Sequence, residues 1–141
     1  MIKNKYLTLK KQHEKEINDF PLFFAFNDEQ FKEGLKKLNT TKENLRSIMG
    51  GGFIKKEDVK KWQNLHLKQY NEHKNNFKNE KYVYDMFRYE LGNHEFIITY
   101  DETETLGSLN LTFNELNKNK FLLVLFEKAK KDYLKDADTW N

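Results

Sequence analysis

The sequence predicts an α+β fold dominated by helix, with about five helices packed around a small antiparallel sheet. Apolar residues recur at helical spacing over most of the 141 residues. Three glycines, Gly50–Gly52, lie between two short apolar runs, as in a tight hairpin. Residues 94–100 (HEFIITY) are rich in the β-branched and aromatic side chains that favour strands. At this length we expect one domain, residues 1–141.

The first elements follow from periodicity and from helix-ending residues. Residues 3–19 are expected to form an amphipathic helix, which Pro21 ends because the residue before a proline avoids helical geometry. The apolar run at 21–26 (PLFFAF) fits either a strand or a buried connection. Asn27 is a suitable N-cap for a second, short helix, which Gly34 weakens.

The triple glycine permits three interpretations. In the segment 45–54 (LRSIMGGGFI) it is either the turn of a hairpin, a flexible loop, or a place where the backbone approaches a ligand closely. Phe53 and Ile54 follow it where a phosphate-binding loop would have lysine and serine or threonine. The hairpin is therefore the preferred interpretation.

The second half of the chain is predicted to be mostly helical. The longest helix is expected at 57–79 and another at 80–91, with either a break or a bend at the Asn79–Glu80 junction. The remaining expected elements are the strand at 94–100, a turn with a short helical turn at 101–111, a capping box formed by Thr112 and Glu115, and a final helix at 119–136.

Composition excludes several classes of protein. Without cysteine there are no disulfides and no thiolate metal sites, which fits a reducing compartment. The N-terminal residues lack the apolar stretch of a secretory signal. The longest apolar run, Phe121–Phe126, is too short to cross a membrane. We therefore expect a cytoplasmic protein with no membrane contact, no cofactor and no small-molecule substrate.

The net charge of +3 hides an asymmetry along the sequence. Residues 1–81 carry 18 Lys and Arg against 11 Asp and Glu, and residues 82–141 carry 7 against 11. These counts predict a basic face and an acidic face that would steer charged partners.

The stretch 89–96 (YELGNHEF) raises the possibility of chemistry, because it holds Glu90, His94 and Glu95 together. The structural interpretation is a helix end with Gly92 as its left-handed C′ residue, followed by a turn and a strand. The alternatives are a contact with a partner or RNA, and an acid–base or metal site. A metal site has little support, since there is neither a His-Glu-x-x-His pattern nor a cysteine ligand.

An aromatic stripe marks the long helix at 57–79. His66 and His73 lie on it together with Trp62, Tyr70 and Phe77. Such a stripe at helical spacing usually faces the core. The alternative is that Trp62 and Tyr70 form a stacking surface for bases or for a protein partner.

Lysines give the second functional signal, mostly off this stripe. Acidic residues interleave with them, so a solvated surface is the default, and contact with nucleic acid or an acidic protein is the alternative. The scarcity of arginine, only Arg46 and Arg88, disfavours readout of bases. The predicted partner-binding residues are Lys55, Lys56, Lys60, Lys61, Lys68, Lys74 and Lys78.

Four segments carry a resemblance to a known group. FFAFNDEQFKEGL (23–35), the glycine segment with its following Phe-Ile, YDMFRYELGNHEF (84–96) and TLGSLNLTFNEL (105–116) resemble a family of small uncharacterised proteins of phages and other mobile elements. The likeness runs from about Leu22 to Ala129 and contains no catalytic motif. Some similar proteins are suspected anti-CRISPR proteins.

This resemblance implies an inhibitor of host defence without catalytic residues, acting in the bacterial cytoplasm. Its expected partner is a CRISPR effector nuclease, with an RNA-targeting effector of the Cas13 type as one candidate, or the guide RNA. The lysines above would make the contact, or the acidic residues Asp101, Glu102 and Glu104 would mimic nucleic acid. The alternatives are a small hydrolase using Glu90, His94 and Glu95, and an accessory protein with an unrelated partner.

Overall fold

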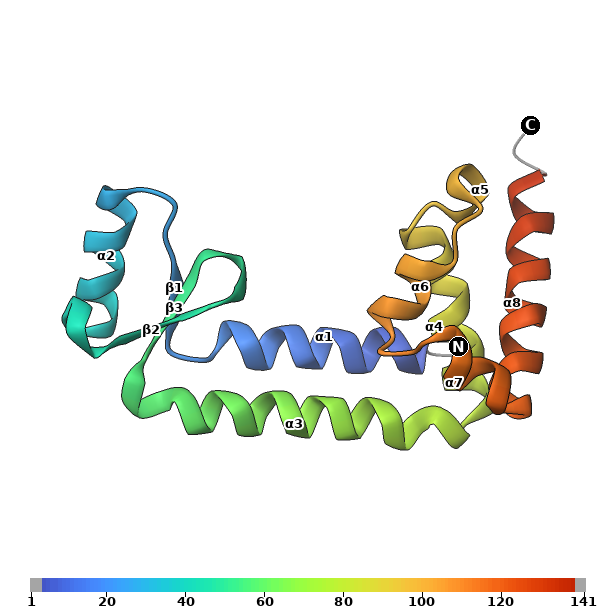
Figure 1. Ribbon diagram of the computed structural model, residues 1–141, viewed down its shortest axis with the longest axis horizontal. Helices are drawn as coiled ribbons and strands as arrows, with labels where there is room; N and C mark the ends of the chain where they lie inside the picture. Colours follow the sequence, from blue (N-terminus) through green and yellow to red (C-terminus); the bar gives the residue numbers. More distant parts are fainter. Residues whose placement is uncertain (1–3, 139–141) are drawn as a thin grey trace. The chain divides into compact units, whose positions relative to one another are not determined.

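A computed structural model describes residues 4–138. The chain divides into two compact units, which we describe separately (Figure 1). The hairpin unit comprises residues 11–72, and the helical unit comprises residues 1–10 and 73–141. The predicted class is confirmed: the structure is α+β, dominated by helix, with a small antiparallel sheet. The expectation of a single domain stays a prediction.

The described residues form eight α-helices and three strands. The helices are α1 (Lys5–Asn18), α2 (Asp28–Leu38), α3 (Val59–Asn75), α4 (Glu80–Asn93), α5 (Phe96–Thr99), α6 (Thr103–Ser108), α7 (Phe113–Lys118) and α8 (Lys120–Asp138). The strands are β1 (Leu22–Phe24), β2 (Leu45–Ile48) and β3 (Gly52–Lys55). Single 3₁₀ turns are η1 (Lys42–Asn44), η2 (Met49–Gly51), η3 (Lys56–Asp58) and η4 (Asn76–Lys78). The three helices beyond the predicted five are α5, α6 and α7.

The glycine segment forms the turn of a hairpin, as predicted. β2 and β3 pair antiparallel with Ser47 opposite Phe53, and β1 pairs with the other edge of β3. Gly50 and Gly51 have φ angles of 78° and 81°, a left-handed geometry that glycine adopts without steric cost. The apolar run after Pro21 is therefore an edge strand of a three-stranded sheet.

Aromatic rings join this sheet to α2. The ring of Phe23 stacks on Phe53 with centroids 5.3 Å apart and meets Phe31 of α2 edge-on at 5.9 Å. Phe23 also lies directly over Gly34, where a Cβ atom would stand 2.0 Å from its ring. The glycine that weakens α2 in isolation thus lets the helix approach the sheet closely. As expected, Asn27 caps α2 by accepting a hydrogen bond from the backbone of Gln30 over 2.8 Å.

Within the hairpin unit, α1 and α3 pair in opposite directions. His13 faces Glu72, while Phe20, just after the end of α1, packs edge-on against Trp62 with centroids 5.0 Å apart. Later residues of α1 therefore meet earlier residues of α3. Trp62 is half-buried in this contact, so it packs within the unit.

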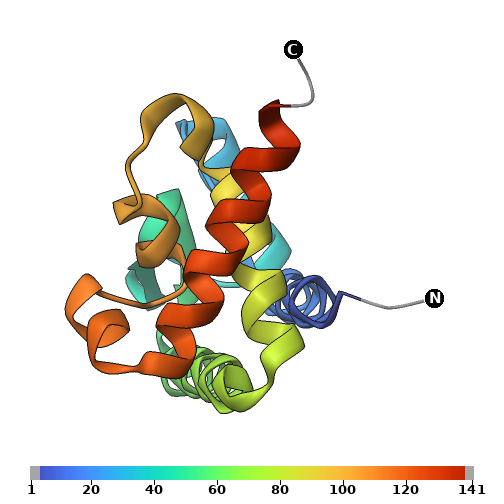
Figure 2. The ribbon, with the colours of Figure 1, turned by 90° about the vertical axis from the view of Figure 1, so that its right-hand side faces the viewer.

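In the helical unit, α4 and α8 run side by side (Figures 1 and 2). Tyr84 bonds to Asp132 and Arg88 pairs with Asp136, so the same offset of 48 residues recurs and the helices run parallel. The core between and around them contains Tyr82, Val83, Met86, Phe87, Leu91, Phe96, Leu106, Leu109, Leu111, Leu116, Leu122, Leu125, Phe126 and Ala129.

The predicted strand at 94–100 is wrong, and the helix end before it was misplaced. The α4 helix continues through Gly92 to Asn93, and Glu95, not Gly92, has the left-handed backbone, with φ of 52°. The residues that follow form α5, whose buried Phe96 packs against Tyr133. The sheet found in the described residues lies wholly in the hairpin unit, so this segment satisfies its amides by helical bonds instead.

Along residues 4–138, no helix combines the length and the apolar character that crossing a bilayer requires.

Candidate functional site

The predicted lysines are divided between the two units. Lys55 ends β3, Lys56 lies in η3, and Lys60, Lys61 and Lys68 are on α3, all in the hairpin unit. Lys74 and Lys78 belong to the helical unit.

Several of these lysines already have partners. Lys68 pairs with Glu16 at 2.5 Å and with Glu72 at 3.3 Å. Lys74 donates to the carbonyl oxygen of Asn110 over 2.7 Å, and burial lowers the pKa of its ammonium group. Both lysines are thus engaged in internal contacts. The exposed members of the predicted set are Lys56, Lys60, Lys61, Lys68 and Lys78.

A hollow of about 310 Å³ lies at the end of the hairpin unit's sheet, and we call it the polar hollow. It is lined by Asn39, Thr40, Asn44, Lys55, Lys56 and Glu57. Asn39 lines it from a left-handed C-cap position after α2, Lys55 from the end of β3 and Lys56 from the start of η3. Ammonium, amide and hydroxyl groups can together bind an oxyanion such as phosphate. Glu57, which is 72% exposed and pairs with Lys55 at 3.2 Å, lies at the same place and partly offsets the positive charge.

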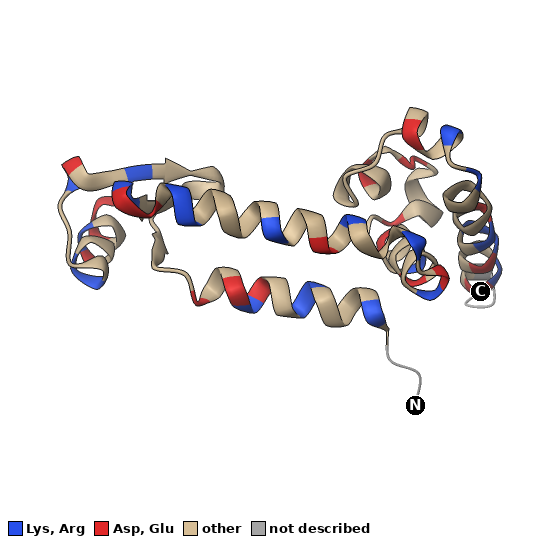
Figure 3. Cartoon of the chain, turned by 90° about the horizontal axis from the view of Figure 1, so that it is seen from below, with Lys and Arg blue, Asp and Glu red and all other residues tan. Residues whose placement is uncertain are grey.

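The charge asymmetry along the sequence does not separate the two units. The hairpin unit carries 12 Lys and Arg against 10 Asp and Glu, and the helical unit carries 13 against 12. Their net charges are therefore +2 and +1. Figure 3 shows basic and acidic positions on the same helices, including α1 and α8. The basic signal is consequently local, at particular clusters such as the polar hollow.

The structure brings Glu90 and His94 together in the helical unit. Glu90 is fully buried, and its Oε2 atom lies 3.1 Å from Nε2 of His94. The hydroxyl of Ser108 donates to the same oxygen over 2.9 Å. The other oxygen, Oε1, accepts from the Tyr6 hydroxyl at 2.9 Å and from the Lys10 ammonium at 3.1 Å.

These contacts decide the ionisation of Glu90. Burial acts to raise the pKa of its carboxyl, but the hydrogen bonds from Lys10, Tyr6 and Ser108, with the charge of Lys10, outweigh burial and lower it. Burial and the neighbouring Glu90 carboxylate also raise the pKa of the Tyr6 phenol far above its ordinary value. Glu90 is therefore an anion held in place by its donors.

The arrangement of Ser108, Glu90 and His94 fits a structural role for the Glu90 carboxylate better than a catalytic role in a hydrolase. In a nucleophile–base–acid chain the histidine stands between the hydroxyl and the carboxylate. Here the carboxylate of Glu90 stands between Ser108 and His94, and the second nitrogen of His94 faces Glu104 at 3.6 Å. Glu95 does not join them, because it lines a different cavity.

That cavity is an apolar pocket of about 640 Å³ among α4, α5 and α8. Its rim includes Ile98, which is 72% exposed, and the Arg88 guanidinium lies 5.5 Å from the ring centre of Tyr133. Arg88 already pairs with Asp136, so its charge is matched inside the pocket.

The two histidines of the predicted stripe have different environments. His73 is buried, with Nδ1 2.7 Å from the Tyr82 hydroxyl and Nε2 2.9 Å from the carbonyl oxygen of Leu109. His66 is exposed and packs edge-on to Trp62 at 4.3 Å. The core interpretation is thus confirmed for His73. Tyr70 is 46% exposed, and the stacking role proposed for it and Trp62 stays a prediction.

The acidic residues considered for mimicry of nucleic acid are partly engaged inside the unit. Glu102 pairs with Lys130 at 2.8 Å. Asp101 accepts a hydrogen bond from the backbone amide of Thr103, and this bond lowers the pKa of its carboxyl. Glu104 stays largely exposed, at 77% of its side chain.

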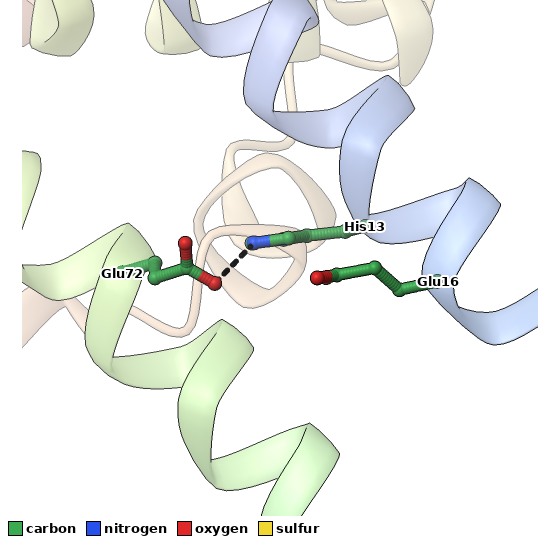
Figure 4. A group of neighbouring side chains, drawn as sticks. All are labelled: His13, Glu16 and Glu72. Carbon is green, nitrogen blue, oxygen red and sulfur yellow. Dashed lines mark ion pairs between the residues drawn. The ribbon is translucent and has the colours of Figure 1, made fainter.

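A cluster that sequence reasoning missed lies between α1 and α3 of the hairpin unit (Figure 4). His13, Glu16 and Glu72 each direct one possible metal-ligating atom to a common point, and all three atoms lie within 4.8 Å of one another. The first two are three residues apart on one helix. That spacing was visible in the sequence, but Glu72 joins them only through the antiparallel pairing of α1 with α3.

No curated protein and no solved structure matches the chain significantly. A family model does match, over residues 5–132, and therefore covers α1 through most of α8, including the polar hollow, the Glu90 network and the cluster between α1 and α3. The chain belongs to this family, DUF7659, described as a family of unknown function.

Proposed function

We propose that the protein is a binding protein that holds a phosphate-bearing or carboxylate-bearing partner at the polar hollow of its hairpin unit. The observation that carries the proposal is the meeting of Lys55 and Lys56 with Asn39, Thr40 and Asn44 in the lining of one hollow. Lysine ammonium groups bind backbone phosphates as point charges, and amide and hydroxyl groups add hydrogen bonds without reading base sequence.

Two further lysines extend this surface. Lys60 and Lys61 are exposed on the first turn of α3, which begins directly after the 3₁₀ turn that holds Lys56. A nucleic-acid backbone that places one phosphate group in the polar hollow can reach the side chains of Lys60 and Lys61 with its next phosphate group. The other three predicted lysines contribute less in this proposal. Lys68 pairs with glutamates inside the unit. Lys74 and Lys78 belong to the helical unit, and Lys74 also bonds a backbone carbonyl there.

The narrower proposal concerns the setting. The sequence resembles mobile-element proteins, and within that group the role would be inhibition of an RNA-guided nuclease in the bacterial cytoplasm. Such effectors hold a guide RNA in a positively charged channel, so a protein could bind exposed guide phosphates or acidic protein surface. The hydrolase alternative is weaker, because Glu90 is enclosed by donors, and Ser108 and His94 both bond to the same oxygen of Glu90 instead of to each other.

The test is a binding titration with a guide-loaded CRISPR nuclease and with free single-stranded RNA. The variant changes Lys55, Lys56, Lys60 and Lys61 to Glu. We expect affinity to fall by more than about tenfold, since each lost phosphate contact contributes of order 1 kcal/mol. In addition, the local electrostatic field changes from positive to negative. Binding should also weaken as salt is raised.

A matched control carries the same change in net charge at a different place. Lys118, Lys120, Lys131 and Lys135 are exposed residues of the helical unit, and replacing all four by Glu alters total charge equally. This control should bind like the parent if the hollow is the site. Equal losses in both variants would mean that only net charge matters, and unchanged binding in a folded first variant would refute the proposal. The exposed acidic residue Glu104 would then be the next to examine.

A further inference from the structure

We propose that His13, Glu16 and Glu72 of the hairpin unit form a binding site for one divalent transition-metal ion, with zinc as the best match. One imidazole nitrogen and two carboxylate oxygens are a ligand set that zinc accepts readily. They come from two antiparallel helices, α1 and α3, and point toward one another (Figure 4).

The distance between two of the ligand atoms already suits zinc. Nε2 of His13 lies 3.4 Å from Oε1 of Glu72. Two ligands at tetrahedral angles on a zinc ion, with bonds of about 2.0–2.1 Å, stand roughly 3.3–3.4 Å apart. Nε2 of His13 is shielded from solvent and makes no hydrogen bond with the described residues. Its contact is the ion pair with Glu72, and a metal ion between the two residues would ligate both atoms.

Gln69 holds the cluster in position from α3. Its side-chain amide donates to Oε1 of Glu16 and to the backbone carbonyl of His13, each over 3.1 Å. Gln69 is only 9% exposed, so its contacts are fixed by packing. Hydrogen bonds from a buried neighbour orient metal ligands and strengthen their binding. The carboxylate of Glu16 and the backbone of His13 are thus anchored to α3 before any ion binds.

Lys68 is the group that an ion must displace. Its ammonium pairs with Glu16 and Glu72 and neutralises part of their charge. Since its side chain is 51% exposed, it can turn into solvent when a dication arrives. Lys68 therefore acts as an exchangeable counter-ion that weakens metal binding without preventing it. Three protein ligands would leave one tetrahedral position for water or another ligand.

The decisive measurement is isothermal titration calorimetry of the metal-stripped full-length protein with zinc chloride in a non-chelating buffer. We expect saturable binding of one ion per chain and a rise in melting temperature with zinc concentration. His13→Gln and Glu72→Gln should each weaken binding by more than about 100-fold, since even outer-shell partners of a metal are worth about 10–100-fold. Cobalt(II) bound at the site should show the intense visible absorption of four-coordinate geometry.

Two further variants separate this site from casual binding. Lys68→Met should tighten zinc binding by about tenfold, because the ion no longer has to break two ion pairs. His66→Gln removes an exposed histidine of the same helix outside the cluster and should leave binding unchanged. Circular dichroism checks that each variant is folded. The proposal is overturned if neither the parent nor Lys68→Met binds zinc saturably, or if binding survives both His13→Gln and Glu72→Gln.

Discussion

The hydroxyl of Tyr6 donates a hydrogen bond to the buried carboxylate of Glu90 over 2.9 Å, although 84 residues separate the two in the sequence. Lys10, one helical turn after Tyr6, binds the same oxygen at 3.1 Å. The start of α1 is therefore joined to the end of α4 through a single anion. Because water cannot reach Glu90, each protein donor replaces hydration that the carboxylate lost on folding.

Replacing Glu90 with Gln should destabilise the protein by about 2–4 kcal/mol, because the amide leaves Lys10 without its counter-charge and presents N–H groups to other donors. Urea unfolding at neutral pH measures this. Glu104→Gln is the control, since that carboxylate also faces His94 but is 77% exposed, and it should change stability by less than about 0.5 kcal/mol. Equal effects of the two substitutions would contradict the structural role of Glu90.

The same carboxylate predicts how stability depends on pH. The pKa of Glu90 is lower in the folded protein than its ordinary value of 4.5, so its ionised form stabilises the fold above that pH. The contribution is lost as the pH falls through the lowered folded-state pKa. Unfolding free energies measured from pH 7 to pH 3 should therefore decline more steeply in the parent than in Glu90→Gln. Parallel curves would show that Glu90 is not linked to acid unfolding.

His73 should occupy one tautomer in its neutral form. The carbonyl oxygen of Leu109 can only accept, so Nε2 must carry the proton and donate to it, and Nδ1 then accepts from the Tyr82 hydroxyl. Nitrogen-15 NMR of the imidazole should report a protonated Nε2 and an unprotonated Nδ1. His66, which is exposed, provides the internal comparison. A protonated Nδ1 in neutral His73 would be incompatible with this network.

Gly34→Ala should destabilise the protein by about 1–3 kcal/mol, because the added methyl group would stand 2.0 Å from the buried ring of Phe23. Alanine would otherwise favour the helix. Gly107→Ala is the matched test of that preference: a Cβ there meets nothing within 4 Å, and the substitution should be neutral or mildly stabilising. Thermal melts of both variants measure the two effects on stability. A Gly34→Ala protein more stable than the parent would show that Phe23 moves aside easily.

Local signals in the sequence were sufficient for most of the fold. The hairpin at the glycine segment, the Asn27 cap and the capping bond of Thr112 to the amide of Glu115 are confirmed, because each depends on residues within a few positions of one another. The helical spacing of apolar residues likewise located the five long helices, α1, α2, α3, α4 and α8, with bounds shifted by a few residues.

Where packing or long-range pairing decides, local signals failed. Residues 94–100 have strand-like composition, but no neighbouring strand is available to them in the described structure, and Phe96 is buried by a short helix instead. Gly92 reads as a helix end, yet its helix continues because Leu91 and its neighbours pack in the core. The cluster of His13, Glu16 and Glu72 needs the pairing of α1 with α3, which no local pattern specifies.

The near-balance of charge in each unit, at +2 and +1, has a consequence for the kinetics of recognition. A large single-signed field accelerates encounter, and a balanced one does not, so association should proceed at roughly the unsteered rate of 10⁵–10⁶ M⁻¹s⁻¹. Salt would then act mainly after encounter, by shortening the lifetime of the complex. For a protein with a few lysines at one hollow, differences in affinity between partners would then come mainly from the dissociation rate of the complex and not from its association rate.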